Sequence, residues 1–180
     1  MDSILVVCYS YSGVTRRAAQ LIASHHGWPL AEIRDRRPGR DWWRCVFDSL
    51  LRRHPRIDYD GPSPGDFRTV VLMAPIWAWR LAGPMRSFIA AHRESLSRFA
   101  MVTTMGSGGA SNAVGEASRI LGHAPIATVA FTQRALEDGS ATARLLAFGD
   151  DLLPPSTAAR TTQSAAISRP AVPGPAAGAH

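Results

Sequence analysis

Apolar runs of strand length alternate along this chain with segments of helical periodicity, and this alternation limits the folds open to it. Each run is mostly apolar, without the polar alternation of a half-exposed strand, which is typical of strands buried on both faces of a parallel sheet. The five runs are Ile4–Tyr9, Leu30–Ile33, Thr69–Ala74, Phe99–Thr104 and Ile126–Phe131. Because parallel strands need helical crossovers, the pattern predicts an α/β fold: a doubly wound, five-stranded parallel sheet with helices on both faces.

The segments between these runs carry the apolar stripes of helices. The first stripe lies on one face of a helix that ends before Gly27, and consists of Val14, Ala18, Leu21, Ile22 and His25. Further helices are expected in four places: after a cap at Asp41, from Pro84, up to Gly122, and along Ala141–Leu152. The stretch from Arg56 to Phe67 is interpreted as a loop.

The composition changes at the end of the chain. After Leu153 the sequence is dominated by Pro, Ala, Ser, Thr and Gly and has no apolar periodicity. Segments of this kind cannot bury enough apolar surface to fold. We therefore expect one folded domain, residues 1–153, followed by a Pro- and Ala-rich disordered tail, residues 154–180.

The basic residues are all arginine: there are 20 of them, and the net charge is +6. A Walker A phosphate loop and a Schiff-base enzyme both need lysine, so a sequence without lysine excludes these two chemistries. Eight arginines crowd around the second expected helix: Arg34, Arg36, Arg37, Arg40, Arg44, Arg52, Arg53 and Arg56. Such a cluster is either a solvated face or a surface for an acidic partner.

The cysteines and histidines give no indication of catalysis or metal binding. Cys8 and Cys45 are far apart and are expected to be reduced thiols, with Cys8 in the core. The histidines show no metal-ligand spacing, and His25 and His26 are expected to interact with the end of a helix. No apolar stretch is long enough to cross a membrane, and the N-terminus lacks the features of a signal peptide. The sequence thus predicts a cytoplasmic protein without membrane insertion, metal site or catalytic residue.

The first expected strand runs into a loop rich in hydroxyl groups, SYSGVT at residues 10–15. Ser10, Ser12 and Thr15 offer hydroxyl donors. Gly13 permits a tight turn, and the helix that follows presents its unpaired N–H groups and the positive end of its dipole. These are features of a phosphate site that needs no cationic side chain. The alternative interpretation is an ordinary turn between a strand and a helix, with Thr15 as the helix N-cap.

Two further loops are expected at the same edge of the sheet, because ligands of an open parallel sheet bind beyond the carboxyl ends of its strands. Trp77 and Trp79 follow the third strand, where they either stack on a flat ring system or pack against the next helix. Arg80 beside them either steers an anion or is a solvated surface residue. Three glycines within residues 106–109 let the backbone approach a ligand, or make the loop flexible. Together the three loops indicate a site for a mononucleotide with a planar aromatic head.

On these residues the chain resembles the flavodoxin family. The family's phosphate loop, T/S-x-T/S-G-x-T, is matched by SYSGVT at residues 10–15. The strand, the aromatic loop and the proline at the start of the next helix are matched by VVLMAPIWAWRLAGP at residues 70–84, and the glycine-bearing turn by TTMGSGG at residues 103–109. The resemblance covers Asp2 to Leu153. It implies a flavodoxin-like fold of the short-chain type, with strand order 2-1-3-4-5.

For the site, the resemblance implies a flavoprotein that binds FMN. By this analogy the first loop holds the phosphate, through Ser10, Tyr11, Ser12, Gly13, Val14 and Thr15. The isoalloxazine is lined by Pro75, Ile76, Trp77 and Ala78, with Trp77 as the stacking tryptophan. The other side of the isoalloxazine is closed by Thr104, Met105, Gly106 and Gly108.

Three functions remain open at this point. The first is electron transfer through the bound flavin, with a redox protein or a small electron donor or acceptor as partner. The second is an NAD(P)H-dependent quinone or FMN reductase of the same fold, and the third is a flavin-free interaction module, against which the intact phosphate loop argues. No nucleic-acid partner is expected, and the protein would be a monomer or a homodimer. Because electron-carrying flavodoxins are usually acidic and this chain is basic, we expect a less negative hydroquinone couple.

Overall fold

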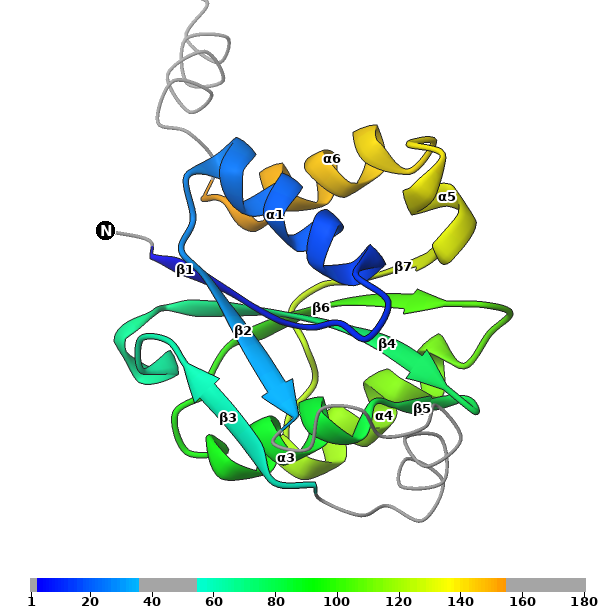
Figure 1. Ribbon diagram of the computed structural model, residues 1–180. Helices are drawn as coiled ribbons and strands as arrows, with labels where there is room; N and C mark the ends of the chain where they lie inside the picture. Colours follow the sequence, from blue (N-terminus) through cyan, green and yellow to red (C-terminus); the bar gives the residue numbers. More distant parts are fainter. Residues whose placement is uncertain (1–2, 36–54, 155–180) are drawn as a thin grey trace, which may run out of the picture.

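The computed structural model describes residues 3–35 and 55–154, in which a central sheet lies between two layers of helices (Figure 1). In the sheet, β1 (Ile4–Tyr9) lies between β2 (Leu30–Asp35) and β4 (Thr69–Trp77). β6 (Phe99–Met105) and β7 (Thr128–Thr132) follow beside β4, and all five strands are parallel. The order β2-β1-β4-β6-β7 is the predicted 2-1-3-4-5 order, so the core of the fold prediction is confirmed.

Two short antiparallel strands extend this sheet, so the prediction of five strands was incomplete. β3 (Ile57–Asp60) pairs with β2 at the edge, where the sequence was interpreted as a loop. Its two apolar residues are half-buried and its two aspartates are exposed, the alternation of an edge strand. β5 (Arg80–Leu81) pairs with the end of β4 and forms a hairpin. The ends of the predicted parallel strands differ from the observed ones by up to three residues.

The helices cover both faces of the sheet, as predicted. α1 (Val14–His26), α5 (Gln133–Glu137) and α6 (Thr142–Leu152) lie on one face, and α3 (Gly83–Ala91) and α4 (Ala110–Leu121) on the other (Figure 1). A short 3-10 helix, Pro64–Asp66, precedes β4.

Four predictions about the chain's organisation lie wholly or mostly outside the described residues. They are the helix after Asp41, the arginine cluster around it except Arg34 and Arg56, the environment of Cys45, and the tail beyond Pro154.

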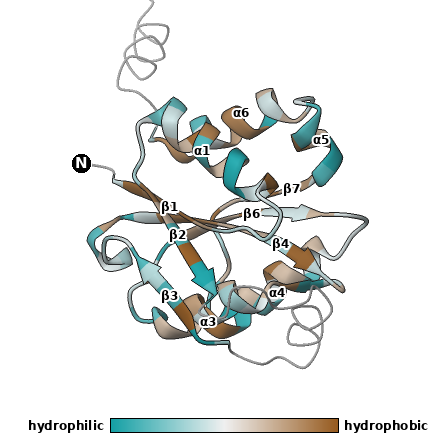
Figure 2. Ribbon diagram, in the orientation of Figure 1, coloured by the Kyte–Doolittle hydropathy of each residue, from teal (hydrophilic) through white to brown (hydrophobic). Residues whose placement is uncertain are grey.

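Two apolar cores form because successive strand residues point to opposite faces. Leu5 and Val7 of β1 belong to the core shared with α3 and α4, whereas Ile4, Val6 and Cys8 belong to the core shared with α1 and α6. In Figure 2 the central strands are hydrophobic while α5 is hydrophilic. The predicted position of Cys8 in the core is therefore confirmed.

The buried face of α1 differs from the predicted stripe at two positions, Leu21 and His25, which are both exposed. Leu21 is 40% exposed, and the buried residues of the middle of the helix are Ala18, Ala19, Ile22 and Ala23. Leu21 lies outside the packed face, in a surface pocket that Leu136 and Leu145 also line.

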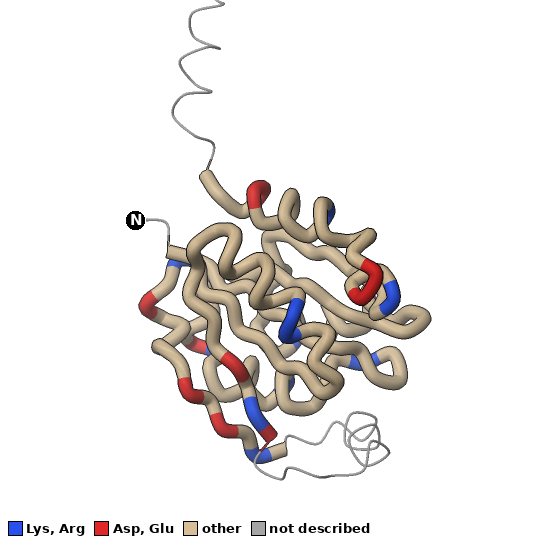
Figure 3. Tube along the Cα trace, turned by 45° about the horizontal axis from the view of Figure 1, so that its top comes forward, with Lys and Arg blue, Asp and Glu red and all other residues tan. Residues whose placement is uncertain are grey.

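The described part of the chain is nearly neutral, unlike the whole sequence. It contains 12 of the arginines and 11 of the acidic residues, for a net charge of +1. Acidic residues of β2 and β3 mark one edge of the sheet (Figure 3). Most of the excess positive charge of the whole sequence therefore belongs to residues outside those described.

Candidate ligand-binding site at the carboxyl edge of the sheet

The three loops singled out from the sequence meet at one edge of the sheet. β1, β4 and β6 are adjacent and parallel, so the segments after them start from the same edge. A hydrogen bond of 2.8 Å joins the Oγ1 atoms of Thr15 and Thr104, which are both buried. Tyr11 meets the ring of Trp77 edge-on, with 5.8 Å between the ring centroids. These two contacts connect the first loop to the other two.

The hydroxyl-rich loop leads into a helix whose first turn has no side-chain cap. Gly13 is the N-cap of α1, with φ of 89°, in the left-handed region that favours glycine. The hydroxyl of Ser10 accepts a hydrogen bond of 3.1 Å from the N–H of Gly13. The interpretation with Thr15 as N-cap is wrong, because Thr15 lies in the first turn and its hydroxyl bonds to Thr104. Among the described residues, no side chain accepts a hydrogen bond from the N–H groups of this first turn.

The β4–β5 hairpin turns through Ala78 and Trp79, which both have positive φ, 47° and 59°. Two positive φ values in a two-residue turn are the geometry of a type I′ turn, which normally contains asparagine or glycine. Non-glycine residues in this region are strained and concentrate at functional sites. The turn holds the Trp79 side chain outward, with 64% of the residue exposed, whereas Trp77 is half-buried against the rings of Tyr9 and Tyr11.

Gly109 lets the hairpin approach the loop after β6. Its φ is 95°, and a Cβ atom placed on it would lie 2.6 Å from the Cα atom of Trp79. Only glycine fits such a contact with backbone. Gly106 differs from Gly109, because no atom lies within 4 Å of a Cβ atom placed on it. The glycines of this loop therefore have separate roles: Gly109 is required for packing, and Gly106 adjoins open space.

A cavity of about 370 Å³ lies between the hairpin and the loop after β6. Seven predicted site residues line it: Ile76, Trp77, Ala78, Thr104, Met105, Gly106 and Gly108. Trp79, Ser107 and Gln133 complete the lining, which contains no charged side chain. Of these, only Gln133 was overlooked in the sequence, although its position directly after β7 puts it at the same edge of the sheet.

The other predicted residues lie around this cavity without lining it. Pro75 is buried in β4 beside Thr104 of β6. The phosphate-loop residues, Ser10, Tyr11, Ser12, Gly13, Val14 and Thr15, do not line the cavity and are connected to it through the contacts of Tyr11 and Thr15. The site thus has two parts: an uncapped helix N-terminus with hydroxyls, and an uncharged aromatic cavity.

A buried ion pair fixes the hairpin on its other side. Glu116 of α4 accepts a hydrogen bond of 3.0 Å from Nη1 of Arg86 in α3, and one of 3.3 Å from the backbone N–H of Leu81 in β5. Glu116 and Arg86 are 6% and 1% exposed. Sequence reasoning missed this pair, because each residue interrupts the apolar face of a different helix.

Two groups of potentially reactive side chains lie away from the cavity. Burial, with a smaller contribution from Glu32, raises the pKa of Cys8 to about 12, so this thiol stays protonated and is not a nucleophile near neutral pH.

At the far end of α1, His25, His26 and Asp150 place ligand atoms within 4.8 Å of one another. Spacing alone could not reveal this cluster, because Asp150 comes from α6. The ring of His26 stacks on Trp28, with 4.3 Å between centroids.

None of the helices in the described residues is both long enough and apolar enough to cross a membrane.

Comparison with known proteins identifies the fold. No family model matches the sequence, and no curated protein matches it. Among solved structures, a flavoprotein from Lactobacillus acidophilus in complex with FMN aligns with a TM-score of 0.64 and 19% identity, over 77% of this chain and 98% of that one. Flavoproteins described as putative, from Bacteroides eggerthii and Bacteroides uniformis, give TM-scores of 0.61 and 0.60 at 19% and 21% identity. They cover 78% and 77% of this chain, and 96% and 97% of their own. Together with the strand order, these likenesses show that the chain has the flavodoxin-like fold.

Proposed function

We propose that this protein binds FMN at the carboxyl edge of its sheet and transfers electrons through the bound flavin. The observation behind the proposal is that a loop suited to a phosphate and a cavity suited to a planar ring lie next to each other in one site. A hydroxyl-rich loop on an uncapped helix N-terminus suits a phosphate, and an uncharged cavity lined by tryptophans suits a planar ring system. The Thr15–Thr104 hydrogen bond ties these two parts together. The solved FMN complex of the Lactobacillus protein, which shares the fold, supports the same cofactor.

The phosphate would be held by the loop from Ser10 to Thr15. Ser12 is exposed and free to rotate its hydroxyl toward an anion, and the backbone N–H groups of the first turn of α1 supply further donors. Ser10 already accepts from the N–H of Gly13, so the loop is folded before the ligand arrives. Preorganisation of this kind lowers the entropy lost on binding.

The isoalloxazine would lie in the cavity between the β4–β5 hairpin and the loop after β6. Trp77, held edge-on by Tyr9 and Tyr11, offers a ring whose position is fixed by its neighbours. The segment from Thr104 to Gly108 also lines the cavity, and the backbone of Gly106, Ser107 and Gly108, which follow β6, would hydrogen-bond the edge of the flavin. When bound, FMN supplies the redox chemistry, and the uncharged lining tunes its potential through stacking and hydrogen bonds.

The simplest test is retention of FMN. The purified full chain is mixed with FMN and desalted, and its absorbance and flavin fluorescence are recorded. Retained visible flavin bands with quenched fluorescence support the proposal. Loss of all flavin at high FMN concentration, with unchanged tryptophan emission, contradicts it and favours a flavin-free interaction module.

A reductase is the second candidate, and a further cavity beside the hairpin favours it because it leaves room for another molecule next to the flavin site. Anaerobic NADH or NADPH is added to the flavin-loaded protein. Bleaching of the flavin bands at a rate that saturates with the nucleotide would identify an NAD(P)H-dependent quinone or FMN reductase. Bands that stay unchanged favour a protein that exchanges electrons with a redox partner or another small donor.

A further inference from the structure

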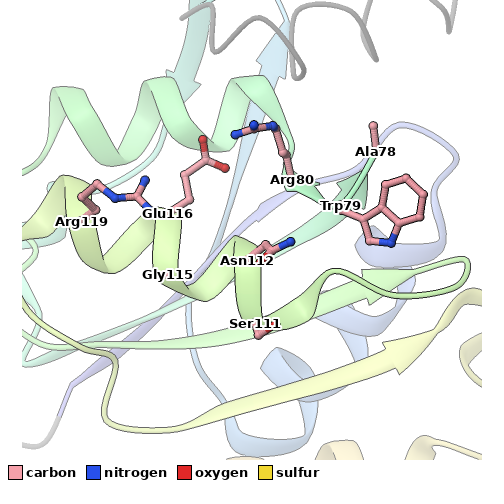
Figure 4. A pocket seen from close by; sticks show the side chains of 8 residues that line it. All are labelled: Ala78, Trp79, Arg80, Ser111, Asn112, Gly115, Glu116 and Arg119. Atoms are coloured by element: carbon pink, nitrogen blue, oxygen red, sulfur yellow. The ribbon is translucent and has the colours of Figure 1, made fainter.

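A second cavity, of about 440 Å³, lies between the β4–β5 hairpin and α4 (Figure 4). The hairpin turn contributes Ala78, Trp79 and Arg80 to its lining, and α4 contributes Ser111, Asn112, Gly115, Glu116 and Arg119. Ala78 and Trp79 line both this cavity and the proposed flavin cavity, so the strained turn adjoins both of them.

The charges around this cavity favour an anion. Glu116 is its acidic lining residue, and the guanidinium of Arg86 and the N–H of Leu81 already bond its two carboxylate oxygens. Its charge is thus compensated from within the fold. Arg80 and Arg119 extend toward Glu116 from opposite sides (Figure 4), and neither forms a salt bridge with an acidic residue of the described part of the chain. Two guanidinium groups therefore remain to meet a ligand.

Neutral polar groups at the rim suit the same ligand. Ser111 and Asn112 lie in the first turn of α4, and both are exposed to the cavity side. The hydroxyl and the carboxamide can each donate a hydrogen bond to an oxygen anion. The helix dipole places positive potential at this end of α4. These two side chains and the helix dipole thus favour binding of an anion, as the two arginines do.

We propose that this cavity binds the carboxylate or phosphate group of a small organic anion, held by Arg80 and Arg119, with Trp79 against the rest of the molecule. The volume exceeds what a single phosphate fills and lies within the range of small-molecule sites. The use of this site as the anchor for a molecule that exchanges electrons with the flavin rests on the proposed function. The binding of the anion itself does not.

The test measures anion binding to the flavin-free full chain by calorimetry, with pyrophosphate in one arm, citrate in the other, and sodium chloride at equal ionic strength as the reference. We expect saturable binding in at least one arm, and that arm identifies the preferred acidic group. Arg80→Gln and Arg119→Gln should each weaken it by at least about tenfold, since each removes a charge-assisted contact. Arg80→Lys should restore part of the affinity, whereas Arg93→Gln, an exposed arginine after α3, should change nothing.

The proposal is wrong if neither anion binds more tightly than chloride, or if binding is unchanged in both the Arg80→Gln and the Arg119→Gln variants. Circular dichroism of each variant separates lost binding from lost folding. The Thr15→Val variant distinguishes this site from the phosphate loop. It should weaken the binding of FMN and leave the arginine-dependent binding of the anion unchanged. Arginine-dependent binding without any FMN affinity would sustain the anion site and overturn the proposed function.

Discussion

The substitution Gly109→Ala tests the close approach of the hairpin to the loop after β6. An added Cβ would lie 2.6 Å from the Cα atom of Trp79 and 3.1 Å from Cγ2 of Ile76. Gly109 also has φ of 95°, which costs an L-residue about 1–2 kcal/mol. Overpacking against backbone that cannot rotate away adds about 1–3 kcal/mol. We therefore expect the free energy of unfolding to fall by about 2–5 kcal/mol, which corresponds to a Tm lower by roughly 4–20 °C for a chain of this size.

Thermal and urea unfolding of the full chain measure this loss, with Gly106→Ala as the matched control. Gly106 belongs to the same loop, but open space surrounds the added methyl group, so the change should stay within about 0.5 kcal/mol. A further Trp79→Ala substitution should not rescue Gly109→Ala, because the clash is with the backbone of Trp79. Equal stability of the two alanine variants would refute the reasoning, since it would mean that the hairpin does not pack on Gly109.

Three other predictions concern the cofactor, the buried ion pair and pH. Trp77→Ala should weaken FMN binding by ~1–3 kcal/mol, measured by fluorescence titration, because a large aromatic contact is lost; a larger loss in Trp79→Ala would reverse the assignment of the stacking tryptophan. Glu116→Gln removes the anionic partner of the buried Arg86 and should destabilise the protein by about 3–5 kcal/mol in urea unfolding; a loss below about 1 kcal/mol would contradict this role. Burial lowers the pKa of His92 from 6.5, so folding favours its neutral form and stability should fall as the pH drops below about 6.5; a His92→Gln variant with the same pH dependence of unfolding would exclude this contribution.

The parallel sheet and its site-bearing edge were predictable because local patterns determine them. Buried parallel strands are apolar runs, and each run here ends abruptly in turn or hydroxyl residues. Since the carboxyl ends of parallel strands share an edge, the positions of the three loops followed from the strand order. The edge strand β3 was missed because its four residues include two aspartates and precede a Gly-Pro pair, which suggested a loop.

The details that shape the site depend on contacts between distant residues. The turn at Ala78 and Trp79 carries no sequence signature of a type I′ turn, and its conformation is fixed by packing on Gly109 and by the bond from Leu81 to Glu116. Thr15 looked like an N-cap because a hydroxyl residue before a helix usually is one. Its actual partner, Thr104, is 89 residues away, beyond the reach of a local rule.

The expected effect of the arginines on the flavin potential remains a prediction. The lining of the proposed flavin cavity is uncharged, and most of the arginines on which the expectation rests lie outside the described residues. A redox titration of the FMN-loaded protein measures it directly. A very negative couple for the second electron would contradict the prediction.

The central claim is that one site holds both the phosphate and the ring system of FMN, and a comparison of FMN with riboflavin tests it most directly. Riboflavin keeps the isoalloxazine and lacks the phosphate. If the Ser10–Thr15 loop supplies at least two hydrogen bonds to the charged group, at ~1.5–3 kcal/mol each, FMN should bind at least about 100-fold more tightly by calorimetry. In Thr15→Val the ratio should shrink while riboflavin affinity changes less. Equal affinities of the two flavins for the unsubstituted protein would contradict the account, because the loop would then not hold the phosphate.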